Sequence, residues 1–142
     1  MALIVGALFF QYALHYPPCE MCHWQRWPHI AAALVGLGGG AMLRSGALKS
    51  SFAIPLAVLT ILLVAVSGAL GVYHAGVEWH WWPGPAACTT GFVFNGTLDL
   101  NAPVPMCDRA AWRLFGISMA GYNAIISLGA AALGTFLMAR KS

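Results

Sequence analysis

Four cysteines are the residues of this chain with the clearest capacity for chemistry. Cys19 and Cys22 form a C-x-x-C pair, whereas Cys88 and Cys107 lie far downstream and far apart. Four cysteines allow three pairings, and sequence alone does not choose among them. A C-x-x-C pair can act as a redox dithiol, hold half of a zinc site, or form an inert structural bridge.

The setting of the C-x-x-C pair favours a redox role. A bridge across two intervening residues closes a small loop, and small loops gain the least stability from cross-linking. Cys22 is expected at the start of a helix, where unpaired backbone N–H groups favour a thiolate. Arg26 follows one helical turn later on the same face. We therefore predict that Cys22 is the more acidic thiol and that Arg26 is functional rather than an arginine that only extends to the headgroups.

A metal site is the alternative for the same residues. His15 or His23 could complete a four-ligand zinc site with Cys19 and Cys22. A second C-x-x-C is absent, however, and the basic Arg26 lies close by. No metal is therefore predicted, and a membrane metal-binding or transport protein is kept as the alternative function.

The composition places these cysteines in a membrane protein. Of the 142 residues, 60% are hydrophobic and 8% are charged, compared with about 25% charged residues in soluble domains. The formal net charge of +3 comes from scattered residues and makes no clustered basic surface, so no nucleic-acid partner is expected. Membrane lipid is the expected surrounding of a single all-α domain over residues 1–142.

Four apolar segments are predicted to be membrane-spanning helices that form a bundle: residues 1–16, 24–43, 52–73 and 112–138. The first is interpreted as a retained helix because Pro17 and its neighbours do not form a small-residue cleavage site. Its 16 residues cover about 24 Å, which is less than the roughly 30 Å of the hydrocarbon layer. Residues 75–110, rich in proline and glycine, are predicted to form a long loop between the third and fourth spans.

Basic residues predict the orientation of this bundle. Lysine and arginine occur in the short loop 44–49 and at 140–141, and such residues mark the cytoplasmic side. The connections after the first and third spans are then on the other side of the membrane. All four cysteines fall in or beside those two connections, where disulfides persist.

Taken in order, these residues resemble the DsbB family of inner-membrane, quinone-reducing proteins that generate disulfides. The resemblance covers nearly the whole chain. It depends on an ordered set of motifs: Cys19-x-x-Cys22-x-x-x-Arg26 opening the second span, Tyr73-His74 closing the third, Cys88 in a Pro-rich loop, and Cys107 followed by Trp112-x-x-x-Gly116-x-x-Met119.

The resemblance implies a path for electrons at the periplasmic side of a bacterial inner membrane. Cys88 and Cys107 would accept electrons from a reduced, DsbA-like soluble thiol oxidase, which attacks Cys88. Cys107 would then exchange with Cys19, and Cys22 would deliver the electrons to a membrane quinone, either ubiquinone or menaquinone.

The same resemblance implies three residues of the quinone site. Arg26 would stabilise negative charge on the quinone, His74 would hydrogen-bond a quinone oxygen, and Met119 would line the pocket. A histidine near a helix C-terminus and a methionine on a membrane helix also have simpler structural roles. Three further polar residues of the fourth span are expected to form interhelical hydrogen bonds, namely Ser118, Asn123 and Ser127.

Two rival classes are less consistent with the sequence. The vitamin K epoxide reductase family also combines four helices, a C-x-x-C pair and a loop cysteine pair. There the C-x-x-C comes late in the chain, whereas here Cys19 and Cys22 come first. A purely structural membrane subunit would explain neither the cysteines nor Arg26.

Overall fold

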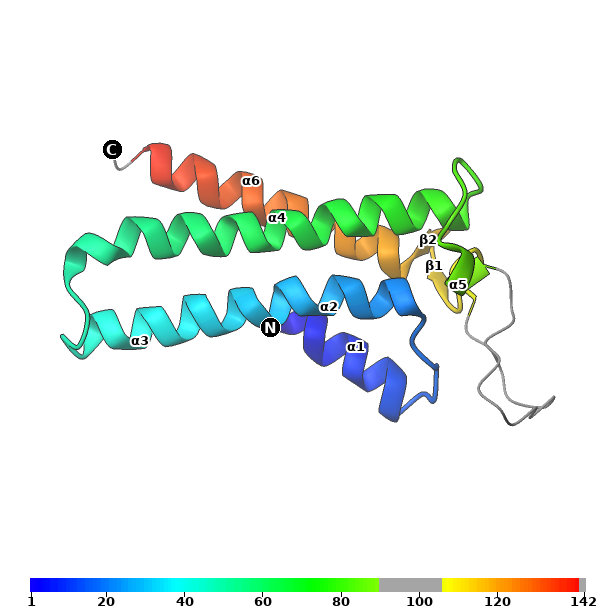
Figure 1. The fold of residues 1–142 in the computed structure, drawn as a ribbon, viewed down its shortest axis with the longest axis horizontal. Helices are drawn as coiled ribbons and strands as arrows, with labels where there is room; N and C mark the ends of the chain where they lie inside the picture. The colour runs from blue at the N-terminus through cyan, green and yellow to red at the C-terminus, as the bar shows by residue number, and fades with distance from the viewer. Residues whose placement is uncertain (90–105, 141–142) are drawn as a thin grey trace.

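The computed structural model describes residues 1–89 and 106–140, and this part of the chain is almost entirely helical (Figure 1). A π-helical turn joins α2 and α3 into one continuous rod, and a 3₁₀ turn precedes α4. In chain order the helical elements are α1 (Ala2–Tyr12), α2 (Glu20–Ala33), the π turn Leu34–Gly38, α3 (Gly39–Arg44), the 3₁₀ turn Ser50–Phe52, α4 (Ala53–Glu78), α5 (Ala86–Thr89) and α6 (Met119–Ala139).

Each predicted apolar segment contains a helix, which confirms the all-α fold class. Among the described residues, Ser50–Glu78 and Met119–Ala139 are long and apolar enough to cross a membrane. The helix α1 has 11 residues and is about 16 Å long at 1.5 Å per residue. That length is short of a bilayer core, so the arrangement with four spans stays a prediction.

The end of α4 differs from the predicted end at residue 73. The helix continues to Glu78, so the Tyr73-His74 motif lies inside the helix and does not close it. Val77 and Glu78 are 1% and 6% exposed, because the last turn of α4 packs against the cysteines. No proline interrupts the chain until Pro83, and this burial favours extension of the helix.

The start of α6 also differs, since the predicted start is residue 112 and the helix begins at Met119. A hairpin precedes it, in which β1 (Arg113–Leu114) pairs antiparallel with β2 (Ile117–Ser118). Phe115 and Gly116 form its two-residue turn with φ values of 50° and 80°, and such positive values are typical of a type I′ turn. The Ser118 side chain then caps α6.

Helix α4 packs along both α6 and α2. Gly71 allows the closest approach, since a Cβ atom there would lie 2.9 Å from the backbone nitrogen of Ala124. Small residues permit such backbone contact between membrane helices. On the outer faces, Leu34, Ile54 and Ile125 are 60% or more exposed, which suits a surface covered by lipid.

The two ends of the molecule carry different residues (Figure 1). The turn between α3 and α4 and the C-terminal end of α6 lie at one end. The start of α2, the end of α4, the helix α5 and the β1–β2 hairpin lie at the other end. This second end holds all four cysteines. The middle of the predicted redox loop, residues 90–105, lies outside the described residues.

Candidate functional site

A disulfide and a free thiol lie in contact at the cysteine end. Cys88 and Cys107 are joined by a disulfide, whereas Cys19 and Cys22 are free thiols. The sulfur atoms of Cys19, Cys88 and Cys107 all lie within 4.8 Å of one another. All three residues are buried, with at most 5% of their surface exposed. The arrangement therefore places a thiol beside the disulfide bond with which it could exchange.

Backbone and apolar contacts hold the disulfide against α2 and α4. Cys107 donates its backbone N–H to the carbonyl of Cys88 over 2.9 Å. Met21 of α2 and Val77 of α4, each 1% exposed, pack in the same cluster as the cysteines. These contacts explain why a disulfide carried by α5 and an irregular segment meets Cys19 at the start of α2.

Cys19 and Cys22 differ in their position on α2, and both precede its apolar part. Cys19 is the N-cap, and its sulfur accepts the backbone N–H of Cys22 over 3.2 Å. The hydrogen bond from the Cys19 thiol lowers the pKa of Cys22, and the positive charge of Arg26 lowers it further. The same hydrogen bond, together with burial, raises the pKa of Cys19. Cys22 is therefore the more acidic thiol, in the order that the sequence predicted.

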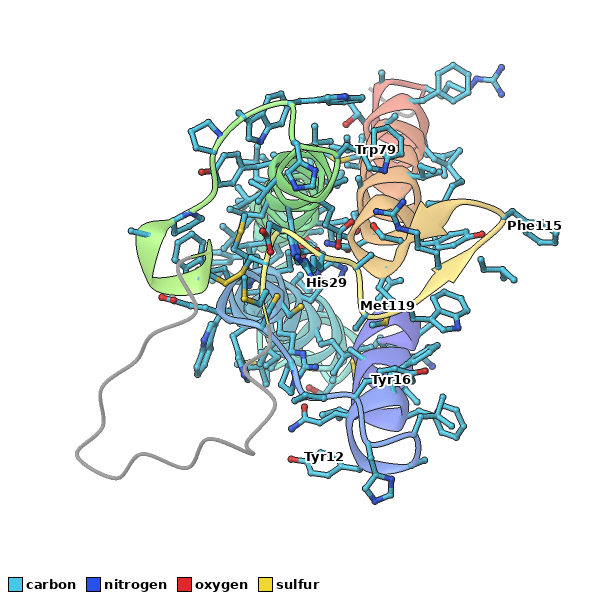
Figure 2. The ribbon with its side chains drawn as sticks, turned by 90° about the vertical axis from the view of Figure 1, so that its right-hand side faces the viewer. Tyr12, Tyr16, His29, Trp79, Phe115 and Met119 are labelled. Carbon is cyan, nitrogen blue, oxygen red and sulfur yellow. A yellow bond between two sulfur atoms is a disulfide. The ribbon has the colours of Figure 1, made fainter. Side chains whose placement is uncertain are left out.

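A cavity of about 680 Å³ opens beside this dithiol, within the range of about 300 to 1,000 Å³ typical of ligand pockets. Side chains from α1, α2, α4, α6 and the segment before the hairpin form its mostly apolar wall. The structure brings all three predicted quinone-site residues to this wall, namely Arg26, His74 and Met119. Figure 2 shows Met119 between α6 and α1.

The guanidinium of Arg26 is held at the cavity wall by α1. Its Nη1 atom donates a hydrogen bond of 2.6 Å to Oε1 of Gln11. Within residues 1–89 and 106–140 no carboxylate forms an ion pair with it. The positive charge is thus fixed beside the dithiol and is available to a negatively charged group in the cavity.

A buried chain of polar side chains leads from the cysteines into the bundle. His74 Nδ1 lies 2.8 Å from Gln25 Nε2, and Gln25 Oε1 accepts from Asn123 over 2.7 Å. Asn123 in turn accepts from Ser127, which contacts His29. Figure 2 looks down on this region from the cysteine end, with His29 in the middle of the bundle. The predicted interhelical hydrogen bonds of Asn123 and Ser127 are confirmed.

Glu78 is a site residue that sequence reasoning missed. It is 6% exposed, and its Oε1 atom lies 3.7 Å from Nε2 of His74. Burial raises the pKa of its carboxyl group, and hydrogen bonding to Ser118 opposes that rise. The Oε2 atom has no hydrogen-bond partner among the described residues. The sequence did contain a signal for this residue. Glu78 is the one Asp, Glu, Lys or Arg between Lys49 and Asp99, and an isolated charge in an apolar stretch is a candidate functional residue.

The structure does not bring together the residues that the alternative metal site would need. Among the described residues, the groups with three possible ligand atoms are Cys19, Cys22 and His74, and Cys19, Cys88 and Cys107. Neither His15 nor His23 belongs to such a group. The alternative metal site therefore lacks the histidines that the sequence offered for it.

Long apolar helices, a buried disulfide in contact with a thiol pair and an adjacent apolar cavity define a thiol-redox membrane protein. Comparison with known proteins gives the family. The family model for the disulfide bond formation protein DsbB matches residues 1–137, and the chain belongs to this family of membrane-bound, disulfide-forming oxidoreductases.

Curated relatives agree with this assignment. A disulfide bond formation protein B of Photobacterium profundum is 31% identical over 87% of this chain and 72% of its own length. One from Shewanella loihica is 30% identical over 94% of this chain and 75% of its own length. One from a Polaromonas species is 27% identical, with 99% and 84% covered. No solved structure matches the chain at a significant level.

Proposed function

We propose that this protein reoxidises a DsbA-like soluble dithiol protein and passes the two electrons through both cysteine pairs to a membrane quinone, either ubiquinone or menaquinone. The observation that carries the proposal is the contact among the sulfurs of Cys19, Cys88 and Cys107, all within 4.8 Å. Thiol–disulfide exchange needs this proximity, because a thiolate must reach the sulfur that it attacks.

In the proposed exchange, the partner's dithiol first reduces the disulfide between Cys88 and Cys107. The Cys107 thiolate then attacks Cys19 of an oxidised Cys19–Cys22 pair, and the electron pair of the broken bond stays on Cys22. Attack of Cys88 on Cys107 restores the first disulfide and leaves Cys19 and Cys22 as thiols. The combination of one disulfide and two thiols in the structure is the state that follows these steps.

The cavity beside Cys22 suits a quinone by size, by its apolar wall and by one fixed positive charge. When bound, a quinone supplies an acceptor for two electrons and two protons. Arg26 would hold negative charge at the ligand end nearest Cys22, because its guanidinium is already oriented by Gln11. His74 and Met119 would complete the wall on the α4 and α6 sides.

The proposed orientation places the cysteine end at the periplasmic face of a bacterial inner membrane. Arg44 ends α3 and Lys49 directly precedes the 3₁₀ turn, so both flank the connection at the opposite end of the bundle (Figure 1), which supports a cytoplasmic location for that connection. In intact cells, an impermeant thiol reagent should label cysteines introduced at residues 84–86 and leave those at 44–50 unlabelled. Labelling of the 44–50 turn from outside would reverse the orientation.

The function is tested with purified protein in detergent, a reduced DsbA-like protein and a soluble quinone analogue. We expect loss of quinone absorbance at a rate that depends on both the dithiol protein and the enzyme. Cys88→Ser should stop this reaction, because the partner then has no disulfide to reduce. Failure of the unmodified protein to reduce the quinone, with both cysteine pairs shown to be intact, would refute the proposal.

A further inference from the structure

Two buried amides beside the cysteines have an orientation that the backbone determines. Gln25 Nε2 lies 3.2 Å from the carbonyl oxygen of Met21, and Asn123 Nδ2 lies 3.0 Å from the carbonyl oxygen of Ser67. A carbonyl oxygen only accepts hydrogen bonds, so each of these atoms must be the amide N–H₂ donor. Turning either amide over would place two oxygens against each other.

The orientation of both amides decides which nitrogen of His74 carries its proton. Asn123 donates to Gln25 Oε1 over 2.7 Å, so the remaining donor of Gln25 faces Nδ1 of His74 at 2.8 Å. An atom that faces a donor must accept, and Nδ1 is therefore the unprotonated nitrogen of neutral His74. The proton is then on Nε2.

The surroundings of His74 Nε2 agree with this assignment, because its neighbours are acceptors. The sulfur of Cys19 lies 3.7 Å away, and the carboxyl oxygen Oε1 of Glu78 also lies 3.7 Å away. His74, Gln25 and Asn123 are each no more than 9% exposed, so water cannot readily replace these contacts. A zinc ion on Cys19, Cys22 and His74 would need an unprotonated Nε2, which the network opposes.

We propose that Gln25 and Asn123 are positioning residues that hold His74 with its proton on Nε2, so that His74 donates a hydrogen bond to the sulfur of Cys19. The inference depends on the proposed redox role of Cys19 and Cys22. When Cys88 attacks Cys107 and breaks the mixed disulfide between Cys107 and Cys19, the electron pair of that bond remains on the Cys19 sulfur as a thiolate. A hydrogen bond from His74 stabilises that thiolate, in addition to the backbone N–H of Cys22.

The first test needs no variant. In protein carrying ¹⁵N-labelled histidine, the signal assigned to His74 by its loss in His74→Phe should be that of a neutral ring protonated on Nε2. Gln25→Glu should move the proton to Nδ1, because the introduced carboxylate accepts there. Ser127→Ala removes a bond to the other end of Asn123 and should leave the signal unchanged. A proton on Nδ1 in the unmodified protein would overturn the proposal.

The second test measures Cys19 directly, in a protein that keeps it as the single cysteine. Gln25→Glu should slow alkylation of Cys19 at neutral pH by about tenfold, the effect of losing one hydrogen bond to a charged group. In a His74→Phe background the same substitution should have a much smaller effect, which reports only the added charge. Equal effects in the two backgrounds would contradict the proposal. Neither test uses the quinone or the partner protein. The position of the His74 proton is therefore tested separately from the proposed path of the electrons.

Discussion

The two ends of the bundle are built from the same helices and differ in what those helices enclose. At the cysteine end, the side chains of Gln25, His74 and Asn123 are buried and held by hydrogen bonds between helices, and the buried Glu78 lies beside His74 on α4. At the other end, Arg44 is exposed and Gly39 packs against Leu56. Burial of polar groups is costly unless they are paired, so such a cluster indicates function at one end only.

This difference indicates which end of the molecule should tolerate substitutions without loss of redox activity. The far end needs small residues, apolar surfaces and charges that reach water. The cysteine end needs particular donors and acceptors at particular distances, because an acidic thiol and a charged guanidinium meet there beside a mostly apolar cavity. Matched substitutions at the two ends should therefore have unequal effects.

The largest expected difference is between the arginines at the two ends. Arg26→Ala should lower kcat/KM for a quinone analogue by about 100-fold, as expected for a lost hydrogen bond between charged groups. Arg26→Lys keeps the charge but loses the planar fork, so its loss should be smaller. Arg44→Ala is the control and should leave quinone turnover unchanged. Full activity in Arg26→Ala would show that this arginine only extends to the headgroups.

A smaller difference is expected between the reactivities of the Cys19 and Cys22 thiols. Hydrogen bonding from Cys19 and the charge of Arg26 lower the pKa of Cys22, whereas the pKa of Cys19 is raised. At neutral pH the thiolate should therefore be on Cys22, and iodoacetamide should modify Cys22 at least about tenfold faster than Cys19 in reduced protein. The advantage should fall as the pH drops through the pKa of Cys22. Faster modification of Cys19 would reverse the assignment.

The smallest effect concerns stability and compares two glycines. A Cβ atom on Gly71 would lie 2.9 Å from the backbone of Ala124 and 3.0 Å from that of Ala120. Gly71→Ala should therefore lower the free energy of unfolding by about 1 to 3 kcal/mol, the usual cost of overpacking. Gly38→Ala meets nothing within 4 Å and should be neutral or slightly stabilising. Unfolding in mixed micelles would measure both, and equal stabilities would contradict the close contact between α4 and α6.

Much of the fold was predictable because apolar runs and prolines act locally. The hairpin before α6 was missed, since its turn depends on Phe115, a residue that rarely adopts positive φ. The end of α4 was missed because its last turn is stabilised by burial of Val77 against the cysteines, a contact between distant parts of the chain.

The candidate site was predictable only in part, for the same physical reason. The spacing of Cys19, Cys22 and Arg26 is local to the first two turns of one helix, so sequence could place them together. The polar chain joins Gln25, His74 and Asn123 from three different helices, and no periodicity reports that meeting. The resemblance brought His74 into the site, while Glu78 and Gln25 emerged only from the structure.

The central claim is that electrons pass from Cys88 and Cys107 to Cys19 and Cys22 and then leave at Cys22. The most direct measurement combines two variants with a DsbA-like partner on non-reducing gels and by quinone absorbance. In Cys107→Ser the Cys88 thiolate should attack the disulfide of the oxidised partner and hold it as a mixed disulfide, because Cys107 is no longer present to resolve it. Cys22→Ser should abolish quinone reduction while the Cys88–Cys107 disulfide is still reduced once by the partner. A partner trapped on Cys22, or quinone reduction that survives without Cys22, would contradict this order.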